Sequence, residues 1–252
     1  MKIKYWITFA LLFVCIIGCG INAMAMETGF DTEDLSSEDY ERIKSVLGVE
    51  LITDEPQAAS ISSFDVSDEG LIALGISNIS SKKMICIYDD TGEFQYGYIF
   101  NEAGSFLVEF CGNNLNVYTA RGNIIFSIGQ SGKIEDVKLV KDTRENNLYK
   151  YDLKTTTKTR GDTTYIIRND LGAFRNFIAT DYSQVVLTNG EEEIIIYDVS
   201  SIQRTKQTVM LYFVFGMFMI GGVGGIVELI KASYKYHKKK KTNGKNAPCH
   251  FD

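Results

Sequence analysis

Two uncharged apolar runs lie near the ends of the chain, with short apolar runs between them. The first extends from Tyr5 to Ile21, follows Lys2 and Lys4, and is followed by small residues ending at Ala25. This order predicts that residues 1–25 are a secretory signal peptide. Two alternatives stay open, because Cys19 lies in a context that resembles a bacterial lipobox, and because the run is long enough to remain as an N-terminal anchor.

The second run extends from Val209 to Val227, and its 19 residues span about 28 Å as a helix. We therefore expect a transmembrane helix within residues 208–230. Residues 231–252 contain seven lysines and one acidic residue, which predicts a basic cytoplasmic tail. The expected protein is a single-pass protein of the cell membrane with its larger region outside.

Gly221 and Gly225 form a small-xxx-small pair inside this run. Such a pair lets two membrane helices approach closely and predicts helix packing, with a homodimer as the expected product. The alternative is that glycine is simply frequent in membrane helices.

Residues 26–57 are expected to be an acidic segment with one short helix. Residues 26–34 contain few apolar side chains, which favours a mobile segment. Ser36 is placed as a helix N-cap with Asp39 at the N3 position, and Gly48 is placed as the glycine that ends the helix.

Residues 58–202 contain short apolar runs separated by Gly, Asn and Asp, which is typical of β-strands. The predicted strands are Leu71–Ile76, Met84–Tyr88, Asn123–Ile128, Tyr165–Ile167 and Ile194–Tyr197. Several of these runs are continuously apolar, so we expect both faces of their sheets to be covered.

Turn glycines recur at Gly92, Gly132 and Gly172, an interval of 40 residues each time. This interval is the length of one propeller blade. The stretch Phe64–Phe100, with its Tyr88-Asp89 pair before Gly92, resembles the blades of bacterial six-bladed and related propellers. About three and a half blades are present, so the expected fold is mainly β and antiparallel, either a partial or open set of propeller-like blades or a β-sandwich.

The net charge of −6 is unevenly distributed along the chain. Residues 26–207 contain 17 basic and 30 acidic side chains, a net charge of −13, whereas residues 231–252 carry a net charge of +6. The acidic outer region argues against nucleic-acid binding and favours cationic or neutral partners.

Both histidines, His237 and His250, lie in the predicted tail. The outer region therefore lacks the general base of Ser-His-Asp and Cys-His schemes, and we expect no catalytic residues, metal or cofactor there. Glycosidase chemistry needs only two carboxylates. The candidates, most of them beside turn glycines where a role in the turn is favoured, are Asp65, Asp68, Glu69, Asp89, Asp90, Glu93 and Glu109.

Cys86 and Cys111 are the cysteines expected in the mature outer region, where they either form one disulfide or remain thiols, with Cys86 buried in its strand. Phe94, Tyr96, Tyr98 and Phe100 alternate along one strand, so they form either a binding stripe or a packing surface between sheets. Residues 142–164 are polar and contain Tyr149 and Tyr151, which makes them the candidate recognition loop.

These features favour a membrane-anchored, non-enzymatic extracytoplasmic protein that binds a partner or cell-envelope component through its β region. One alternative is a cell-envelope glycan hydrolase that uses paired carboxylates. Another is a sensor, which would signal through a partner because the tail is too short for a folded output domain.

Overall fold

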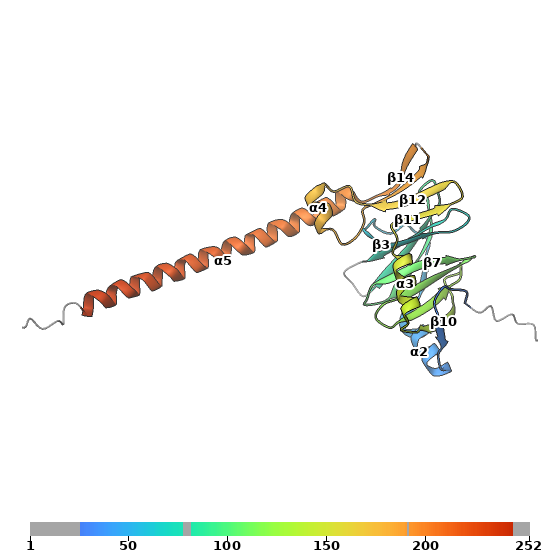
Figure 1. Ribbon diagram of the computed structural model, residues 1–252, viewed down its shortest axis with the longest axis horizontal. Helices are drawn as coiled ribbons and strands as arrows, with labels where there is room; N and C mark the ends of the chain where they lie inside the picture. Colours follow the sequence, from blue (N-terminus) through green and yellow to red (C-terminus); the bar gives the residue numbers. More distant parts are fainter. Residues whose placement is uncertain (1–25, 78–81, 191, 244–252) are drawn as a thin grey trace, which may run out of the picture.

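The computed structural model describes residues 26–77, 82–190 and 192–243, which form three antiparallel sheets and one long C-terminal helix (Figure 1). The mainly β, antiparallel fold predicted from the sequence is confirmed. The three sheets are separate, and no closed barrel or propeller is found in the described ranges. The predicted signal peptide or anchor, residues 1–25, lies outside these ranges.

Each sheet is built on a four-stranded meander in chain order, and two sheets gain an N-terminal edge strand. Sheet I contains β2 (Glu50–Ile52), β3 (Ile61–Val66), β4 (Ile72–Ser77), β5 (Lys82–Tyr88) and β6 (Phe94–Asn101). Sheet II contains β1 (Thr32–Asp34), β7 (Phe106–Cys111), β8 (Asn114–Thr119), β9 (Ile124–Ile128) and β10 (Ile134–Val140). Sheet III contains β11 (Thr157–Arg160), β12 (Thr163–Arg168), β13 (Gln184–Asn189) and β14 (Glu192–Asp198).

Positive-φ glycines stand at the first and third turns of every meander. Those at the first turns are Gly70, Gly112 and Gly161, and those at the third turns are Gly92, Gly132 and Gly190. The predicted repeat is therefore correct for Gly92 and Gly132 and wrong for Gly172, which precedes a helix between β12 and β13. That inserted helix lengthens the third unit and moves its equivalent glycine to position 190.

Sheet I lies between sheets II and III, so both of its faces are buried. Phe64 and Leu74 share one apolar core with Ile167 and Val185 of sheet III. The opposite face of sheet I shares a second core with sheet II. This arrangement explains why the central strands β4 and β5 are almost continuously apolar. The first strands of the meanders also meet, since β3 lies against both β7 and β11.

Helix α2 (Ser37–Leu47) confirms the predicted caps. The Ser36 hydroxyl accepts a hydrogen bond from the Asp39 N–H at 3.1 Å, and Gly48 ends the helix with φ of 50°. Its apolar side packs at the edge of the core between sheets I and II.

Two segments differ from the sequence expectation. Residues 26–34 are packed, because Phe30 is buried and β1 pairs with β10. Residues 142–164 form α3 (Arg144–Leu153), β11 and the start of β12 instead of a loop. Helix α3 covers the outer face of sheet II, where Leu153 joins Phe30 and Tyr118 in a third core.

Two further helices complete the described chain. The short α4 (Ala173–Ile178) lies beside the start of α5 (Ser200–Asn243) (Figure 1). Among the described residues, no helix meets the length and hydropathy required to cross a membrane. Gly221 and Gly225 lie on α5, with surroundings that fall outside the described part of the chain.

Candidate functional site

A row of polar side chains crosses the outer face of sheet II. Glu109 of β7 is opposite Asn116 of β8, Asn116 is opposite Ser127 of β9, and Ser127 is opposite Asp136 of β10. Directly paired residues of an antiparallel sheet project from the same face, so strand register brings these four side chains together. The neighbouring positions Leu115 and Val117 point into the core between sheets I and II.

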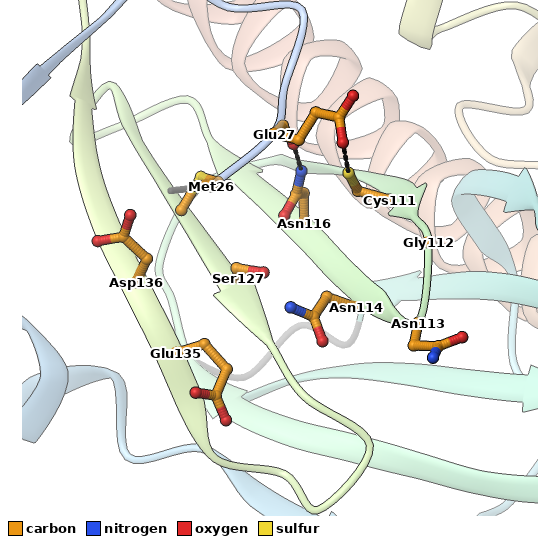
Figure 2. Close-up of a pocket in the computed structure, with 10 residues that line it drawn as sticks. All are labelled: Met26, Glu27, Cys111, Gly112, Asn113, Asn114, Asn116, Ser127, Glu135 and Asp136. Atoms are coloured by element: carbon orange, nitrogen blue, oxygen red, sulfur yellow. Dashed lines mark hydrogen bonds between the residues drawn. The ribbon is translucent and has the colours of Figure 1, made fainter. Parts of the chain in front are cut away.

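Three members of this row, Asn116, Ser127 and Asp136, lie at the floor of an open pocket with a cavity volume of about 470 Å³ (Figure 2). The residues that line it are Met26, Glu27, Cys111, Gly112, Asn113, Asn114, Asn116, Ser127, Glu135 and Asp136. A register shift in β10 between Ile134 and Asp136 makes two consecutive acids, Glu135 and Asp136, face the same cavity.

The N-terminal segment supplies one wall of the pocket. The Asn116 side-chain amide donates a hydrogen bond to the Glu27 carbonyl oxygen at 2.8 Å, and the Cys111 thiol lies 4.0 Å from the Glu27 carboxylate (Figure 2). Asn116 is 1% exposed, and its side-chain oxygen has no hydrogen-bond partner among the described residues. The pocket thus depends on residues 26–27 being packed against the sheet.

The pocket is electrostatically negative. Its lining includes three carboxylates and no basic residue, and the ion pair from Lys138 to Asp136 is long, at 3.9 Å. Burial raises the pKa of the Cys111 thiol, and the negative charges of Glu27 and Glu109 add to this effect. The thiol is therefore protonated at neutral pH and is a poor nucleophile. Carboxylate, amide and hydroxyl oxygens suit a ligand that presents ammonium or hydroxyl groups.

A buried charge cluster adjoins the pocket where β3, β7 and β11 meet. Asp65 is 2% exposed. One of its carboxylate oxygens accepts a hydrogen bond from the Phe110 N–H at 2.7 Å, and the other lies 3.4 Å from the Lys158 ammonium. Arg160 lies 3.9 Å from the same carboxylate and donates to the Val66 carbonyl at 3.0 Å. Asp65 thus links all three sheets.

Glu109, at the β7 end of the polar row, is close to the charges of this cluster. Burial raises the pKa of its carboxyl, and the nearby negative charge of Asp65 acts in the same direction. Hydrogen bonds from Tyr149 and Asn116 and the positive charge of Lys158 oppose that rise. Burial and the hydrogen bond to Glu109 also raise the pKa of Tyr149.

The predicted aromatic stripe is a packing surface. Tyr98 is 2% exposed and donates a hydrogen bond to the Gly129 carbonyl oxygen at 3.1 Å, while Tyr96 is half-buried beside it. Both pack with Phe100 in the core between sheets I and II. Phe94 packs in the core against sheet III instead, because a register shift in the β5–β6 pair separates it from Tyr96.

The two tyrosines of residues 142–164 separate on α3. Tyr149 contacts Phe30 edge to face, and its hydroxyl donates a hydrogen bond to the Glu109 carboxylate. Tyr149 therefore holds Glu109 in place and does not itself line the pocket. Tyr151 is 71% exposed and does not line the pocket.

Of the two alternatives left open for Cys86 and Cys111, the structure shows thiols, because both cysteines are free. Cys86 is buried between sheets I and III, whereas Cys111 lies at the rim of the pocket on sheet II. The alternative expectation of a buried thiol at Cys86 is confirmed.

Among the predicted carboxylates, Asp65 and Glu109 come together and Asp89 forms a turn. Asp89 accepts hydrogen bonds from the N–H groups of Thr91 and Glu93, which confirms the interpretation of this acid as a turn residue. Sequence reasoning missed Asn116, Ser127 and Asp136, whose alternation with apolar neighbours is visible but whose register is not. No cluster of three His, Cys, Asp or Glu side chains within the described ranges is placed to hold a metal ion.

Comparisons with protein-family models, with curated proteins and with solved structures find no match to this chain.

Proposed function

We propose that this protein is a membrane-anchored extracytoplasmic binding protein that holds a cell-envelope component in the pocket on sheet II. The observation that carries the proposal is the polar row of sheet II, of which Asn116, Ser127 and Asp136 lie beneath an open, acidic cavity. A row of acceptors without a basic side chain favours ligands with several hydroxyl groups and at least one ammonium group. An amino sugar within a glycan has this chemistry.

The negative charge of residues 26–207 supports the same class of ligand. An excess of 13 acidic charges attracts cationic groups and repels anionic polymers at low salt. The pocket adds short-range selectivity, because Glu27, Glu135 and Asp136 surround it from two sides (Figure 2).

Glucosamine and N-acetylglucosamine tetrasaccharides are matched probes, since they differ mainly in the ammonium charge. Calorimetry on the full-length protein in detergent should show tighter binding of the glucosamine form. Glu135→Gln should weaken that binding about fivefold, which is typical for one exposed charge-assisted contact. Glu192→Gln, an exposed acid on β14, is the control and should leave binding unchanged. Equal affinity for both probes, no binding, or no effect of Glu135→Gln would refute the proposed ligand class.

Membrane attachment is supported by the sequence. Val209–Val227 is uncharged and is followed by a lysine-rich segment, and α5 is continuous from Ser200 to Asn243. The expected topology places residues 26–207 outside and the C-terminus in the cytoplasm. A C-terminal epitope tag should resist external protease in intact cells and become sensitive after permeabilisation. Extraction of the protein by alkaline carbonate would contradict the anchor.

We also propose that the three meanders are an open, partial set of propeller-like blades. Their common topology, the glycines at equivalent turns and the contact of first strands β3, β7 and β11 support this interpretation. It agrees with the blade resemblance of residues 64–100.

A glycan hydrolase remains the second candidate, because Glu109, with its raised pKa, lies near the charged Asp65. Such a pair resembles the acid and carboxylate of a glycosidase. The contacts favour a structural role, since both oxygens of Asp65 already have partners. Release of reducing ends from a cell-wall glycan, abolished by Asp65→Asn and by Glu109→Gln in folded protein, would establish the hydrolase and overturn the binding proposal.

A further inference from the structure

Helix α4 presents two phenylalanines to solvent. Phe174 is 64% exposed and Phe177 is 87% exposed, although the helix lies in a connection between two buried strands, β12 and β13. Exposed side chains of this size are unfavourable in water, and neighbouring ones mark an interaction surface.

Polar contacts fix α4 against the first turns of α5. The Arg175 guanidinium donates to the Thr208 hydroxyl at 3.0 Å, and the Gln207 side-chain amide donates to the Arg175 carbonyl oxygen at 3.3 Å. One turn earlier, Arg204 forms an ion pair with Asp170 at 3.5 Å. The position of α4 is therefore set relative to residue 208, the last polar residue before the long apolar run.

The apolar surface continues from α4 onto α5. Val209, Tyr212 and Phe213 are 64%, 74% and 68% exposed, and they follow Thr208 directly. Figure 1 shows α4 beside the start of α5, and the hydrogen bond from Arg175 to Thr208 places α4 next to residue 209. An apolar environment that contacts residues 209–213 of α5 would therefore also contact Phe174 and Phe177.

We propose that α4 is a membrane-interface contact, in which Phe174 and Phe177 enter the headgroup region of the bilayer that α5 crosses. This inference rests on the proposed membrane anchor. Aromatic side chains favour the boundary between headgroups and acyl chains, and the cationic groups of Arg175 and Arg204 lie at headgroup level beside them. The contact gives the β region a second attachment to the membrane and restrains its orientation.

Tryptophan fluorescence tests the contact directly. Trp6 is the single tryptophan of the chain, so Trp6→Phe provides a silent background for Phe177→Trp in the full-length protein. Leu148→Trp on α3 is the matched control, since Leu148 is also exposed, at 55%, and lies on the outer face of sheet II. Both variants are reconstituted into phosphatidylcholine and phosphatidylglycerol vesicles, with and without lipids brominated on the upper acyl chain.

The Phe177→Trp fluorescence should fall at least twofold with brominated lipid and resist acrylamide, whereas the Leu148→Trp fluorescence should respond only to acrylamide. Flotation of the vesicles measures anchoring separately. Protein that floats but whose Phe177→Trp signal is quenched only by acrylamide overturns the contact and leaves the anchor standing. A signal shielded from both quenchers indicates a protein contact and overturns it too, and protein that does not float refutes the anchor and this inference together.

Discussion

The Phe110 N–H donates a hydrogen bond to the Asp65 carboxylate at 2.7 Å, so a side chain of β3 takes the place of the strand neighbour that β7 lacks. Strand β7 is the edge of sheet II, and an edge leaves backbone donors unpaired. The same carboxylate faces Lys158 of β11, so one acid completes an edge and joins three sheets.

Asp65→Ala should therefore destabilise the protein by about 3 kcal/mol, because it leaves a largely buried ammonium and a partly buried N–H without their partner. Urea unfolding followed by circular dichroism measures the change. Asp68→Ala is the control, since Asp68 is 95% exposed and pairs with Arg160 only at 3.5 Å. An equally small effect of both changes would contradict the central role of Asp65.

Glu109 should make stability fall as the pH rises. Its folded-state pKa is raised above the ordinary value of 4.5, so the native protein holds this proton at pH values where the unfolded chain has lost it. Stability from this group is complete below about pH 4.5 and is lost as the pH rises through the folded pKa. Urea unfolding from pH 4 to pH 7 should show a shallower decline in Glu109→Gln, and an unchanged profile in the Glu192→Gln control.

Cys86 and Cys111 should remain thiols under oxidising conditions. Burial raises the pKa of Cys86 to about 12, so alkylation at pH 8 should modify Cys111 in the native protein and Cys86 only after unfolding. Intact mass with and without reductant checks for the disulfide, whose detection in correctly folded protein would overturn this expectation.

Gly92→Ala should cost more than Gly190→Ala, although both glycines have φ above 80°. A Cβ atom on Gly92 would lie 2.7 Å from the Ile196 carbonyl oxygen of sheet III, whereas no atom of the described residues beyond its chain neighbours lies within 4 Å of one on Gly190. We expect about 1 kcal/mol for the unfavourable φ at Gly190 and at least about 2 kcal/mol at Gly92. Equal losses in chemical denaturation would show that the two sheets separate easily at this turn.

Replacing Gly221 and Gly225 by leucine should weaken dimerisation through α5, because leucine side chains keep two helix backbones apart. Crosslinking in membranes and gel mobility in detergent should both show less dimer. Gly216→Leu, outside the small-xxx-small pair, is the comparison and should keep the dimer. Unchanged crosslinking in the double variant would refute packing at these glycines.

Local features of the fold were readable from the sequence. The caps of α2 at Ser36 and Gly48 depend only on nearby residues in the chain. The same holds for the apolar runs that form β4, β5, β9, β12 and β14. Helix α3 also has a local signal, since the Thr143 hydroxyl caps the Asn146 N–H, but its polar composition favoured a loop.

The candidate site was not readable in the same way, because it depends on register and on distant contacts. Asp136 faces the pocket beside Glu135 only because β10 is irregular there. Lys158 meets Asp65 only because β11 and β3 lie side by side, which no spacing in the sequence encodes. Phe94 does not share a face with Tyr96, Tyr98 and Phe100 as predicted, because of a single register shift in the β5–β6 pair.

The N-terminal edge strands impose an order on folding. Strands β1 and β2 leave the ribosome first, yet their partners β10 and β6 are made much later. The meanders of sheets I and II close through short hairpins, whereas joining β1 to β10 closes a loop of about a hundred residues, and such long closures are slow. The first strands to be synthesised therefore wait for partners made later, and β1, which follows the Glu27 wall of the pocket, can pair only after β10 has been made.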